Sequence, residues 1–209
     1  MKTILVTGGC GFIGSHTCIS LLEEGYKLIV VDSNINSSPL SLERVKKIVQ
    51  KENIVIQEII LKNGDIRDVN FLNNVFKEAT LANNPITAVI HFAGLKSVFE
   101  SVKNPTLYWN VNVVGSLVLF KVMEQYDCKT IVFSSSATIY GDDWSGSISE
   151  STSIDPKNPY GNTKATIEII LKDLFKVSGN NWRVANLRYF NPIGAHPSGM
   201  LGENPLGIP

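Results

Sequence analysis

A tyrosine and a lysine, Tyr160 and Lys164, stand four residues apart in the segment NPYGNTK. Asn158 can cap a helix at this point and Pro159 suits its first turn, so both side chains are expected on one helix face. A phenol becomes a base near neutral pH only if its pKa falls from about 10 toward 7, and one nearby cation shifts a pKa by about 1–3 units. We therefore expect Tyr160 to need a second cation, besides Lys164, before it accepts a proton.

Three serines, Ser134, Ser135 and Ser136, end the apolar run TIVFSSS that comes before this helix. Hydroxyl groups at a strand end can hold a substrate alcohol or carbonyl oxygen against Tyr160 during proton transfer, although a serine cluster can equally stabilise a turn. Of the six tyrosines in the chain, Tyr160 alone is followed by a lysine four residues later. These residue types together predict proton transfer to or from a substrate oxygen.

A glycine-rich loop, TGGCGFIG, follows the first apolar run and places Gly8, Gly11 and Gly14 three residues apart. A tight turn, a close approach of the backbone to a pyrophosphate, and close packing of helix on strand each require a missing side chain. The N-terminus of the helix that follows offers free N–H donors to phosphate. An ordinary glycine turn is the alternative, but the position between a strand and a helix favours a dinucleotide site.

An aspartate, Asp32, ends the second apolar run, eighteen residues after Gly14. Its carboxylate can accept hydrogen bonds from both ribose hydroxyls and would repel a 2′-phosphate, which favours NAD over NADP as the cofactor. A plain turn or helix cap is the alternative role for Asp32. The positive nicotinamide of NAD⁺ would be the second cation that Tyr160 needs.

The elements that must position these residues alternate between strand and helix. Apolar, β-branched runs predict buried parallel strands in TILVT, KLIVVD, EIILKNGD, AVIHFAG, TIVFSSS and RVANLRYFN. Helix-length segments lie between them, at about 12–24, 41–52, 68–79, 105–126 and 159–178. This alternation predicts an α/β fold with a doubly wound parallel sheet of Rossmann type, whose ligand site lies at the carboxyl ends of the strands.

Two regions of unequal size are expected along the chain. Residues 1–190 carry the alternating pattern and form the predicted NAD-binding Rossmann-type domain. Residues 191–209 hold four prolines and four glycines without helical or strand periodicity, so they cannot close a second core. We interpret them as the truncated start of a connection to a smaller C-terminal substrate lobe that is largely missing.

Composition excludes several classes of function. The chain has 209 residues, 44% of them hydrophobic, and a net charge of zero, so no long-range field attracts nucleic acid or an anionic membrane. Three cysteines without CxxC spacing suggest neither disulfides nor a thiolate metal site, and a reducing cytoplasm fits best. No segment of signal-peptide or membrane-span length is expected. The histidines His16, His91 and His196 lack companion ligands, so no metal site is expected either.

Taken together, TGGCGFIG, GDIRD, HFAGLKSV, SSSATIYGD, PYGNTK and RYFNPIGAHPSG resemble the extended short-chain dehydrogenase/reductase family, and within it the UDP-glucose 4-epimerases. The resemblance spans essentially the whole chain. It implies that Ser136, Tyr160 and Lys164 are catalytic, and that Lys96, Ser136, Tyr160 and Asn191 contact the substrate. It implies that NAD is held by Gly8, Gly11, Phe12, Ile13, Gly14, Asp32, Ser33, Asn34, Ile35, Asn36, Ser37, Asp65, Ile66, Phe92, Ala93, Gly94, Leu95, Lys96, Asn112, Tyr160, Lys164 and Phe190.

The resemblance also implies a reaction. Tyr160 would remove the proton of the sugar 4-hydroxyl while NAD⁺ takes hydride, and return of hydride to the other face of the 4-keto sugar would interconvert UDP-glucose and UDP-galactose. The implied partners are a UDP-hexose and a second copy of the chain, in a homodimer formed through the helices at 105–126 and 159–178.

Two other functions stay open from the sequence. One is a nucleotide-sugar 4,6-dehydratase or decarboxylase of the same family, whose members usually carry an Asp-Glu pair where this chain has Ala137 and Thr138. The other is an NAD-binding module without activity, because the substrate lobe is missing. Lys96 and Asn112 could also be ordinary surface or helix-bonding residues.

Overall fold

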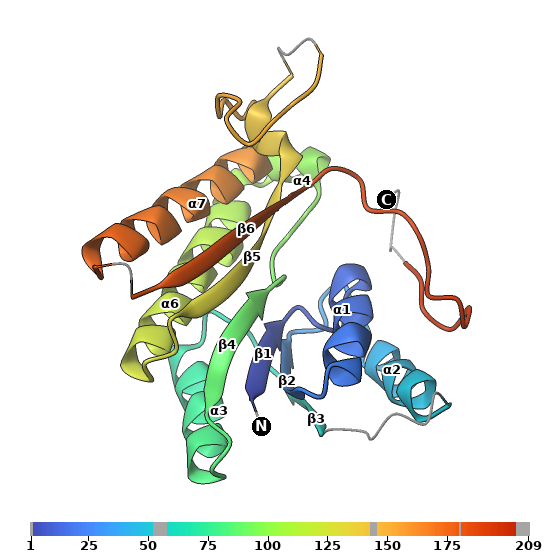
Figure 1. Cartoon of the computed structure of the whole chain (residues 1–209). Helices are drawn as coiled ribbons and strands as arrows, with labels where there is room; N and C mark the ends of the chain where they lie inside the picture. Colours follow the sequence, from blue (N-terminus) through green and yellow to red (C-terminus); the bar gives the residue numbers. More distant parts are fainter. Residues whose placement is uncertain (1, 52–57, 143–145, 180, 204–209) are drawn as a thin grey trace.

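A computed structural model of the chain describes residues 2–51, 58–142, 146–179 and 181–203. Its centre is a six-stranded parallel sheet in the order β3-β2-β1-β4-β5-β6 (Figure 1). The strands are β1 (Thr3–Thr7), β2 (Lys27–Asp32), β3 (Ile59–Asn63), β4 (Ile86–His91), β5 (Thr130–Ser136) and β6 (Arg183–Tyr189). The strand order reverses between β1 and β4, and ligands of doubly wound sheets bind at the carboxyl side of such a reversal. The predicted fold class is confirmed.

Helices cover both faces of the sheet (Figure 1). The α-helices are α1 (Phe12–Glu23), α2 (Leu40–Lys51), α3 (Val69–Leu81), α4 (Val98–Lys103), α5 (Pro105–Tyr108), α6 (Gly115–Gln125) and α7 (Pro159–Val177). A π-helical segment, η1 (Trp109–Val114), joins α5 to α6, and a 3-10 helix, η2 (Ala137–Tyr140), follows β5. One core cluster joins α1 and α2 to the sheet, and the other joins α3, α6 and α7 to it.

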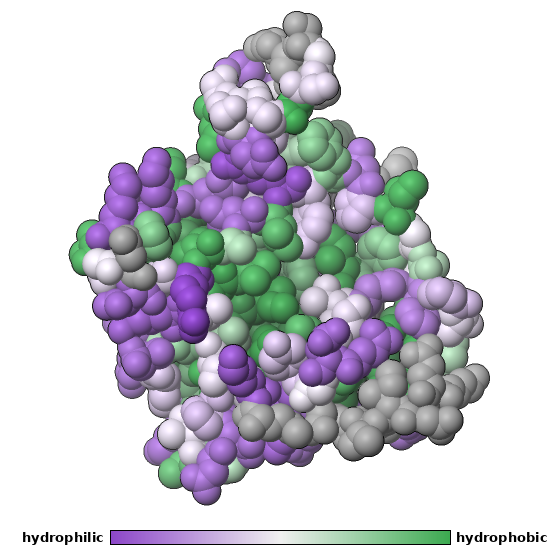
Figure 2. Space-filling model, viewed as in Figure 1, coloured by the Kyte–Doolittle hydropathy of each residue, from purple (hydrophilic) through white to green (hydrophobic). Residues whose placement is uncertain are grey.

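The strands are buried because their sequences are apolar on both sides. All five residues of β1 are buried, as are five of the six in β2. Such continuous burial explains the runs of Val, Ile and Leu that predicted parallel strands. The edge strand β6 is different, since all seven of its residues are exposed or half-buried. Figure 2 shows apolar side chains at the surface in the middle of the face presented in Figure 1.

The expected helices are present with small shifts of their ends, and residue 52, the expected end of the second helix, lies outside the described residues. The helix expected at 105–126 is the continuous run α5–η1–α6, with a π-helical turn that the sequence did not predict. The short helices α4 and η2 were also not predicted. The fourth strand is Ile86–His91 rather than 88–94, because the chain turns away from β1 after His91.

The run from Pro105 to Gln125 is long and apolar enough, by length and composition, to cross a membrane. This differs from the expectation that no segment reaches that length. Half of the apolar window is buried inside the fold, where Leu119, Phe120 and Met123 belong to the core. Packing against α3 and the sheet therefore accounts for its apolar composition.

The described part of the C-terminal region, residues 191–203, contains neither helix nor strand. It runs back from β6 across the sheet to the α1–α2 side of the molecule (Figure 1). Leu201 is buried in the cluster of α1 and α2, and Arg44 donates to the carbonyl of Met200 at 3.2 Å. Nearby, the backbone N–H of His196 donates to Nε2 of His16 at 3.2 Å. These contacts hold the segment against the first two helices.

Candidate active site

The glycine-rich loop is folded tightly against the sheet. Gly8 adopts a φ of +70°, and its N–H donates to the carbonyl of Val31 at 2.8 Å. A Cβ on Gly8 would lie 2.6 Å from the nitrogen of Ala93, and one on Gly14 would lie 2.4 Å from the Gly8 oxygen. Both glycines are therefore required by the fold itself.

Gly11 has a different role in the loop. Its φ is −73°, which any residue can adopt, and in the part of the chain that the structure describes a Cβ there would meet only the Gly8 oxygen within 4 Å, at 3.3 Å. The fold alone does not require this glycine. Gly11 is the N-cap of α1 and makes no side-chain capping bond, so N–H groups of the first turn, which contains Phe12 and Ile13, are available to a ligand. Open space beside uncapped donors fits a pyrophosphate.

Asp32 ties the glycine-rich loop to the turn after β2. Its Oδ2 accepts from the N–H of Cys10 at 2.9 Å, and its Oδ1 accepts from the N–H of Asn34 at 2.9 Å and the hydroxyl of Ser37 at 2.7 Å. The turn-capping role that the sequence left open is thus present. Each carboxylate oxygen can accept about two hydrogen bonds, so Oδ2 keeps capacity for a ribose hydroxyl.

The turn itself offers a further donor to a ligand. The side-chain amide nitrogen of Asn34, Nδ2, is buried and has no hydrogen-bond partner among the described residues, and Asn34 holds a φ of +55°. Ser33, Ile35 and Asn36 beside it are exposed. An unpartnered donor next to a carboxylate fits the hydroxyls of a nucleoside, which can both accept and donate hydrogen bonds.

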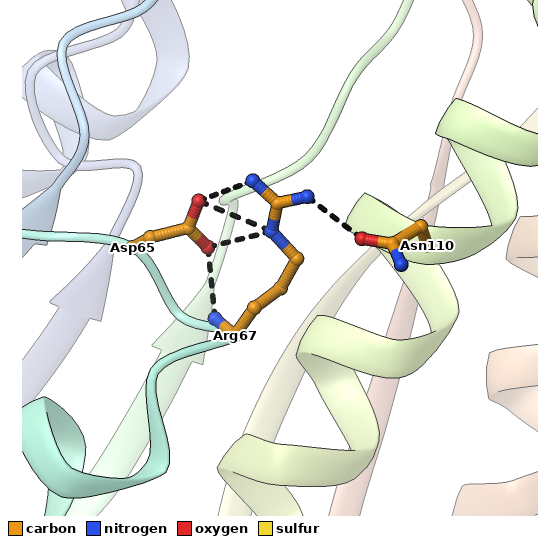
Figure 3. Close-up of polar contacts among 3 residues, drawn as sticks. All are labelled: Asp65, Arg67 and Asn110. Atoms are coloured by element: carbon orange, nitrogen blue, oxygen red, sulfur yellow. Dashed lines mark hydrogen bonds and ion pairs between the residues drawn. The ribbon is translucent and has the colours of Figure 1, made fainter.

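Asp65 is paired with an arginine that the sequence analysis did not select (Figure 3). Both carboxylate oxygens accept from the guanidinium of Arg67, and Oδ1 also accepts from the Arg67 N–H at 2.8 Å. The pKa of Asp65 is lowered by these hydrogen bonds. Arg67 also donates to the side chain of Asn110 at 2.7 Å, which connects the loop after β3 to η1. Ile66, between Asp65 and Arg67 in the sequence, is buried against Gly115.

Asn112 lies in the π-helical segment and is buried, with its amide engaged by protein groups. Its Oδ1 accepts from the N–H of Leu95 at 2.8 Å, and its Nδ2 donates to the Leu95 carbonyl and to Oγ1 of Thr163, both at 3.1 Å. A Cβ on Gly94 would lie 3.0 Å from Asn112 Oδ1. The amide therefore positions the loop Phe92–Lys96 against α7 rather than reaching outward. π-Helical turns often occur at functional sites.

A buried histidine, His91, is connected through Ser116 to the π-helical segment that carries Asn112. It lies between Thr7, 2.6 Å from Nδ1, and Ser116, 2.9 Å from Nε2. Ser116 in turn donates to the carbonyl of Asn112 at 2.5 Å. Burial lowers the pKa of His91 to about 3, and the charge of Lys164 adds to the effect. His91 is consequently neutral and structural.

Tyr160 and Ser136 meet at the carboxyl edge of the sheet. Asn158 caps α7 by accepting from the N–H of Gly161 at 2.8 Å, and Pro159 occupies the first turn, as predicted. Burial raises the pKa of the Tyr160 phenol, and a hydrogen bond with Ser136 opposes that rise. Ser136 is the N-cap of η2 and also accepts from the hydroxyl of Thr138 at 2.9 Å.

Lys164 is almost completely buried beneath Tyr160. Its ammonium donates to the carbonyl of Ser134 at 2.7 Å and lies 5.8 Å from the centroid of the Tyr160 ring. Burial lowers the pKa of Lys164 to about 8. The pKa of the Tyr160 phenol is nevertheless raised, because burial has the largest influence on it and the hydrogen bond with Ser136 only opposes that rise. That a second cation activates Tyr160 stays a prediction.

Four residues expected at the site lie differently. Ser135 turns to Glu168, whose carboxylate accepts from its hydroxyl at 2.5 Å, so Ser135 does not face a ligand. Lys96 is exposed and forms an ion pair with Glu203 of the C-terminal segment. Phe190 and Asn191 follow β6 and are exposed.

Sequence reasoning missed an ion pair between the buried Glu168 and the half-buried Arg188, beside Ser136 and Tyr160. Arg188 donates to both oxygens of Glu168, at 3.0 and 2.7 Å. The spacing of Glu168, four residues after Lys164 and eight after Tyr160, was the available signal, since it puts a third polar residue on the same helix face.

Comparisons with known proteins agree with this geometry. The family model described as GDP-mannose 4,6 dehydratase matches residues 5–205. UDP-glucose 4-epimerase 2 of Arabidopsis thaliana is 50% identical over 210 residues, with 100% of this chain and 57% of that protein covered. UDP-glucose 4-epimerase of Bacillus subtilis is 50% identical over 206 residues, with 99% and 57% covered.

A solved structure of UDP-glucose 4-epimerase from Bifidobacterium longum, in complex with NAD⁺ and UDP, superposes with a TM-score of 0.89 at 47% identity. The superposition covers 100% of this chain and 59% of that one. The chain therefore spans somewhat more than half the length of the relatives it matches.

Proposed function

This chain belongs to the family described as GDP-mannose 4,6 dehydratase, and within that family we propose that the protein interconverts UDP-glucose and UDP-galactose by NAD-dependent oxidation and reduction at carbon 4 of the sugar. One observation carries the proposal. The phenol of Tyr160, close to Ser136 and with the buried ammonium of Lys164 beneath its ring, lies at the carboxyl edge of the sheet on which the glycine-rich loop is built. The relatives that cover the whole chain at about 50% identity are named as UDP-glucose 4-epimerases.

The residues present fit NAD. Gly11 and the uncapped start of α1 suit the pyrophosphate, while Asp32 and the unpartnered amide of Asn34 suit the adenosine ribose. Asp65, whose charge is balanced by Arg67, lies after the next strand and suits the adenine side. When bound, NAD⁺ supplies the acceptor, and later the donor, of the hydride at the sugar carbon.

The side chains of this protein would carry the proton. Tyr160 accepts the proton of the sugar 4-hydroxyl, while Ser136 donates a hydrogen bond to the same oxygen as it becomes a carbonyl. Because burial raises the pKa of Tyr160, the phenol becomes a base only when positive charge is added near it. The same tyrosine returns the proton once the sugar has presented its other face.

Epimerisation is favoured over 4,6-dehydration by the residues after Ser136. Elimination of water needs an additional acid and base near carbons 5 and 6 of the sugar. Ala137 and Thr138 stand where the dehydratases usually carry Asp and Glu. The Thr138 hydroxyl already donates a hydrogen bond to the Ser136 hydroxyl at 2.9 Å. The site thus supports oxidation and reduction without elimination.

In the direct test, the full-length protein is incubated with UDP-galactose without added NADH, and the formation of UDP-glucose is measured. We expect UDP-glucose to form catalytically and bound NAD to persist through many turnovers. Accumulation of a 4-keto-6-deoxy sugar would instead establish a dehydratase, and absence of any product would support the inactive module.

The wider organisation belongs to the same proposal. We propose that residues 1–190 are the NAD-binding domain and that 191–209 lead into a smaller substrate lobe. The three cysteines are free and buried, which is consistent with a reducing cytoplasm. Exposed apolar residues on α6 and α7, among them Leu117 and Ile169, are consistent with a homodimer, which light scattering of the full-length protein would test.

A further inference from the structure

Glu168 is a buried carboxylate on the helix that carries Tyr160 and Lys164. Its side chain is 6% exposed, and residues four apart on a helix share one face, so all three side chains point toward the sheet. Oε1 of Glu168 accepts from the Ser135 hydroxyl at 2.5 Å and from Nε of Arg188 at 3.0 Å. Oε2 accepts from Nη2 of Arg188 at 2.7 Å. The carboxylate is thus held by β5 and β6 together.

Arg188 extends the contacts to the chain that follows Ser136. Its Nη1 donates to the hydroxyl of Tyr140 at 2.8 Å and to the carbonyl of Glu150 at 3.1 Å, and its guanidinium lies 5.2 Å from the centre of the Tyr140 ring. Tyr140 is the last residue of η2, whose first turn is capped by Ser136. The ion pair therefore contacts the chain on both sides of Ser136.

We propose that Glu168 and Arg188 are positioning residues, which fix β5 and η2 on either side of Ser136 so that the Ser136 hydroxyl stays within hydrogen-bond reach of the Tyr160 phenol. This inference rests on the proposed function, because it assigns the pair a role in the same proton transfer. The pair contacts neither reacting oxygen. It acts through Ser135 on one side and Tyr140 on the other.

Stability alone does not account for an ion pair whose carboxylate is buried and whose guanidinium is half-buried. The cost of removing two charges from water often equals or exceeds their attraction, and apolar residues of similar volume can replace such pairs without loss of stability. What an apolar pair cannot reproduce here is the set of directional bonds to Ser135 and Tyr140. Small displacements of a reacting group can reduce turnover by about two orders of magnitude.

The first experiment uses three variants of the full-length protein, with UDP-galactose as substrate. Glu168→Met/Arg188→Met removes both charges, Ser135→Ala removes one connecting hydroxyl, and Glu78→Gln breaks the exposed pair with Lys62 as a control. We expect the double variant to unfold near the wild-type temperature, with kcat lowered about 10- to 100-fold and KM changed less than about threefold. Ser135→Ala should lower kcat by about tenfold, and the control should match wild type.

The second experiment tests whether the pair acts through Ser136. Glu168→Gln is combined with Ser136→Ala, and the effect of Glu168→Gln on kcat should nearly vanish in the Ser136→Ala background. If the two effects multiply instead, the pair does not act through Ser136 and the proposal is overturned. Wild-type kcat in both Ser135→Ala and the double methionine variant would also overturn it.

A readout without substrate separates this inference from the proposed function. The Tyr160 phenol is titrated by tyrosinate absorbance, relative to Tyr160→Phe protein. Because the hydrogen bond with Ser136 opposes the effect of burial, we expect the pKa of Tyr160 to rise further in Ser135→Ala. An unchanged pKa there would contradict the positioning role even if the wild type proved to catalyse another reaction.

Discussion

The ammonium of Lys164 donates to the backbone carbonyl of Ser134 at 2.7 Å, whereas the centroid of the Tyr160 ring lies 5.8 Å away. The lysine is therefore fixed to the sheet, with the Tyr160 ring beside its ammonium. It also lies 4.9 Å from the centroid of the Phe133 ring. Burial lowers the pKa of Lys164 to about 8, so part of the population is neutral in mildly alkaline solution.

The first prediction follows from that burial. An unfolded lysine titrates near 10.4, so between about pH 8 and pH 10.5 the unfolded chain binds more protons than the folded one. Stability should consequently rise with pH across this window, by about 3 kcal/mol in total, and below pH 8 the fold bears the full cost of the buried charge. Lys164→Met should remove this rise, as measured by urea unfolding at pH 7.5, 9 and 10.

Lys172→Met is the matched control for this experiment, because Lys172 lies on the same helix and is exposed. Its stability should follow the wild-type pH profile. Equal slopes for wild type and Lys164→Met between pH 8 and pH 10 would show that Lys164 is not desolvated as described.

The second prediction concerns the phenol. Tyr160→Phe removes the group that accepts the proton, and general acid–base groups contribute about 10²–10⁴-fold, so kcat should fall by about that factor. Bound NAD should remain, since the glycine-rich loop and Asp32 are unchanged. Conversion of UDP-galactose is compared with that by Tyr126→Phe, whose hydroxyl donates to the Asn73 carbonyl away from the site. Wild-type turnover of UDP-galactose by Tyr160→Phe would contradict the proposed function.

Most of the fold could be predicted from the sequence because its signals are local. The glycine loop between a strand and a helix, and apolar runs of strand length, depend on neighbours within about ten residues. The π-helical turn at Trp109–Val114 could not be predicted this way. Asn112 in it bonds Leu95 and Thr163, which are far away in the sequence, and such tertiary contacts override helix periodicity.

The site was predicted less completely, for the same reason. Tyr160, its helix cap and its lysine share one short segment, so their arrangement follows from helix geometry. Glu168 looks like an ordinary charged residue of an amphipathic helix until β6 brings Arg188 beside it. Likewise, nothing local to Lys96 indicates that Glu203 pairs with it.

The third prediction separates the two roles of Asp32. Asp32→Asn keeps the shape but can accept hydrogen bonds on one side only, so either the contacts to Cys10 and a ribose or those to Asn34 and Ser37 are lost. Hydrogen bonds to a charged group contribute about 1.5–3 kcal/mol, so NAD affinity should weaken about 10- to 100-fold in calorimetric titration. Asp127→Asn, at an exposed turn that asparagine also tolerates, should bind NAD like the wild type.

The last prediction compares two glycines of one loop. A Cβ on Gly14 would lie 2.4 Å from the Gly8 oxygen, so Gly14→Ala should strain the loop and lower the free energy of unfolding by about 1–3 kcal/mol. A Cβ on Gly11 meets that oxygen at 3.3 Å and no other atom of the described residues within 4 Å, so Gly11→Ala should change stability by less than about 1 kcal/mol.

Affinity for NAD should give the opposite contrast. The added methyl group of Gly11→Ala occupies the space through which a pyrophosphate approaches the first turn of α1, so NAD should bind at least about tenfold more weakly. Thermal unfolding of each variant, with and without NAD, measures both quantities. If Gly11→Ala is stabilised by NAD as much as the wild type, the pyrophosphate does not lie against this glycine, and the uncapped N–H groups of α1 serve another ligand.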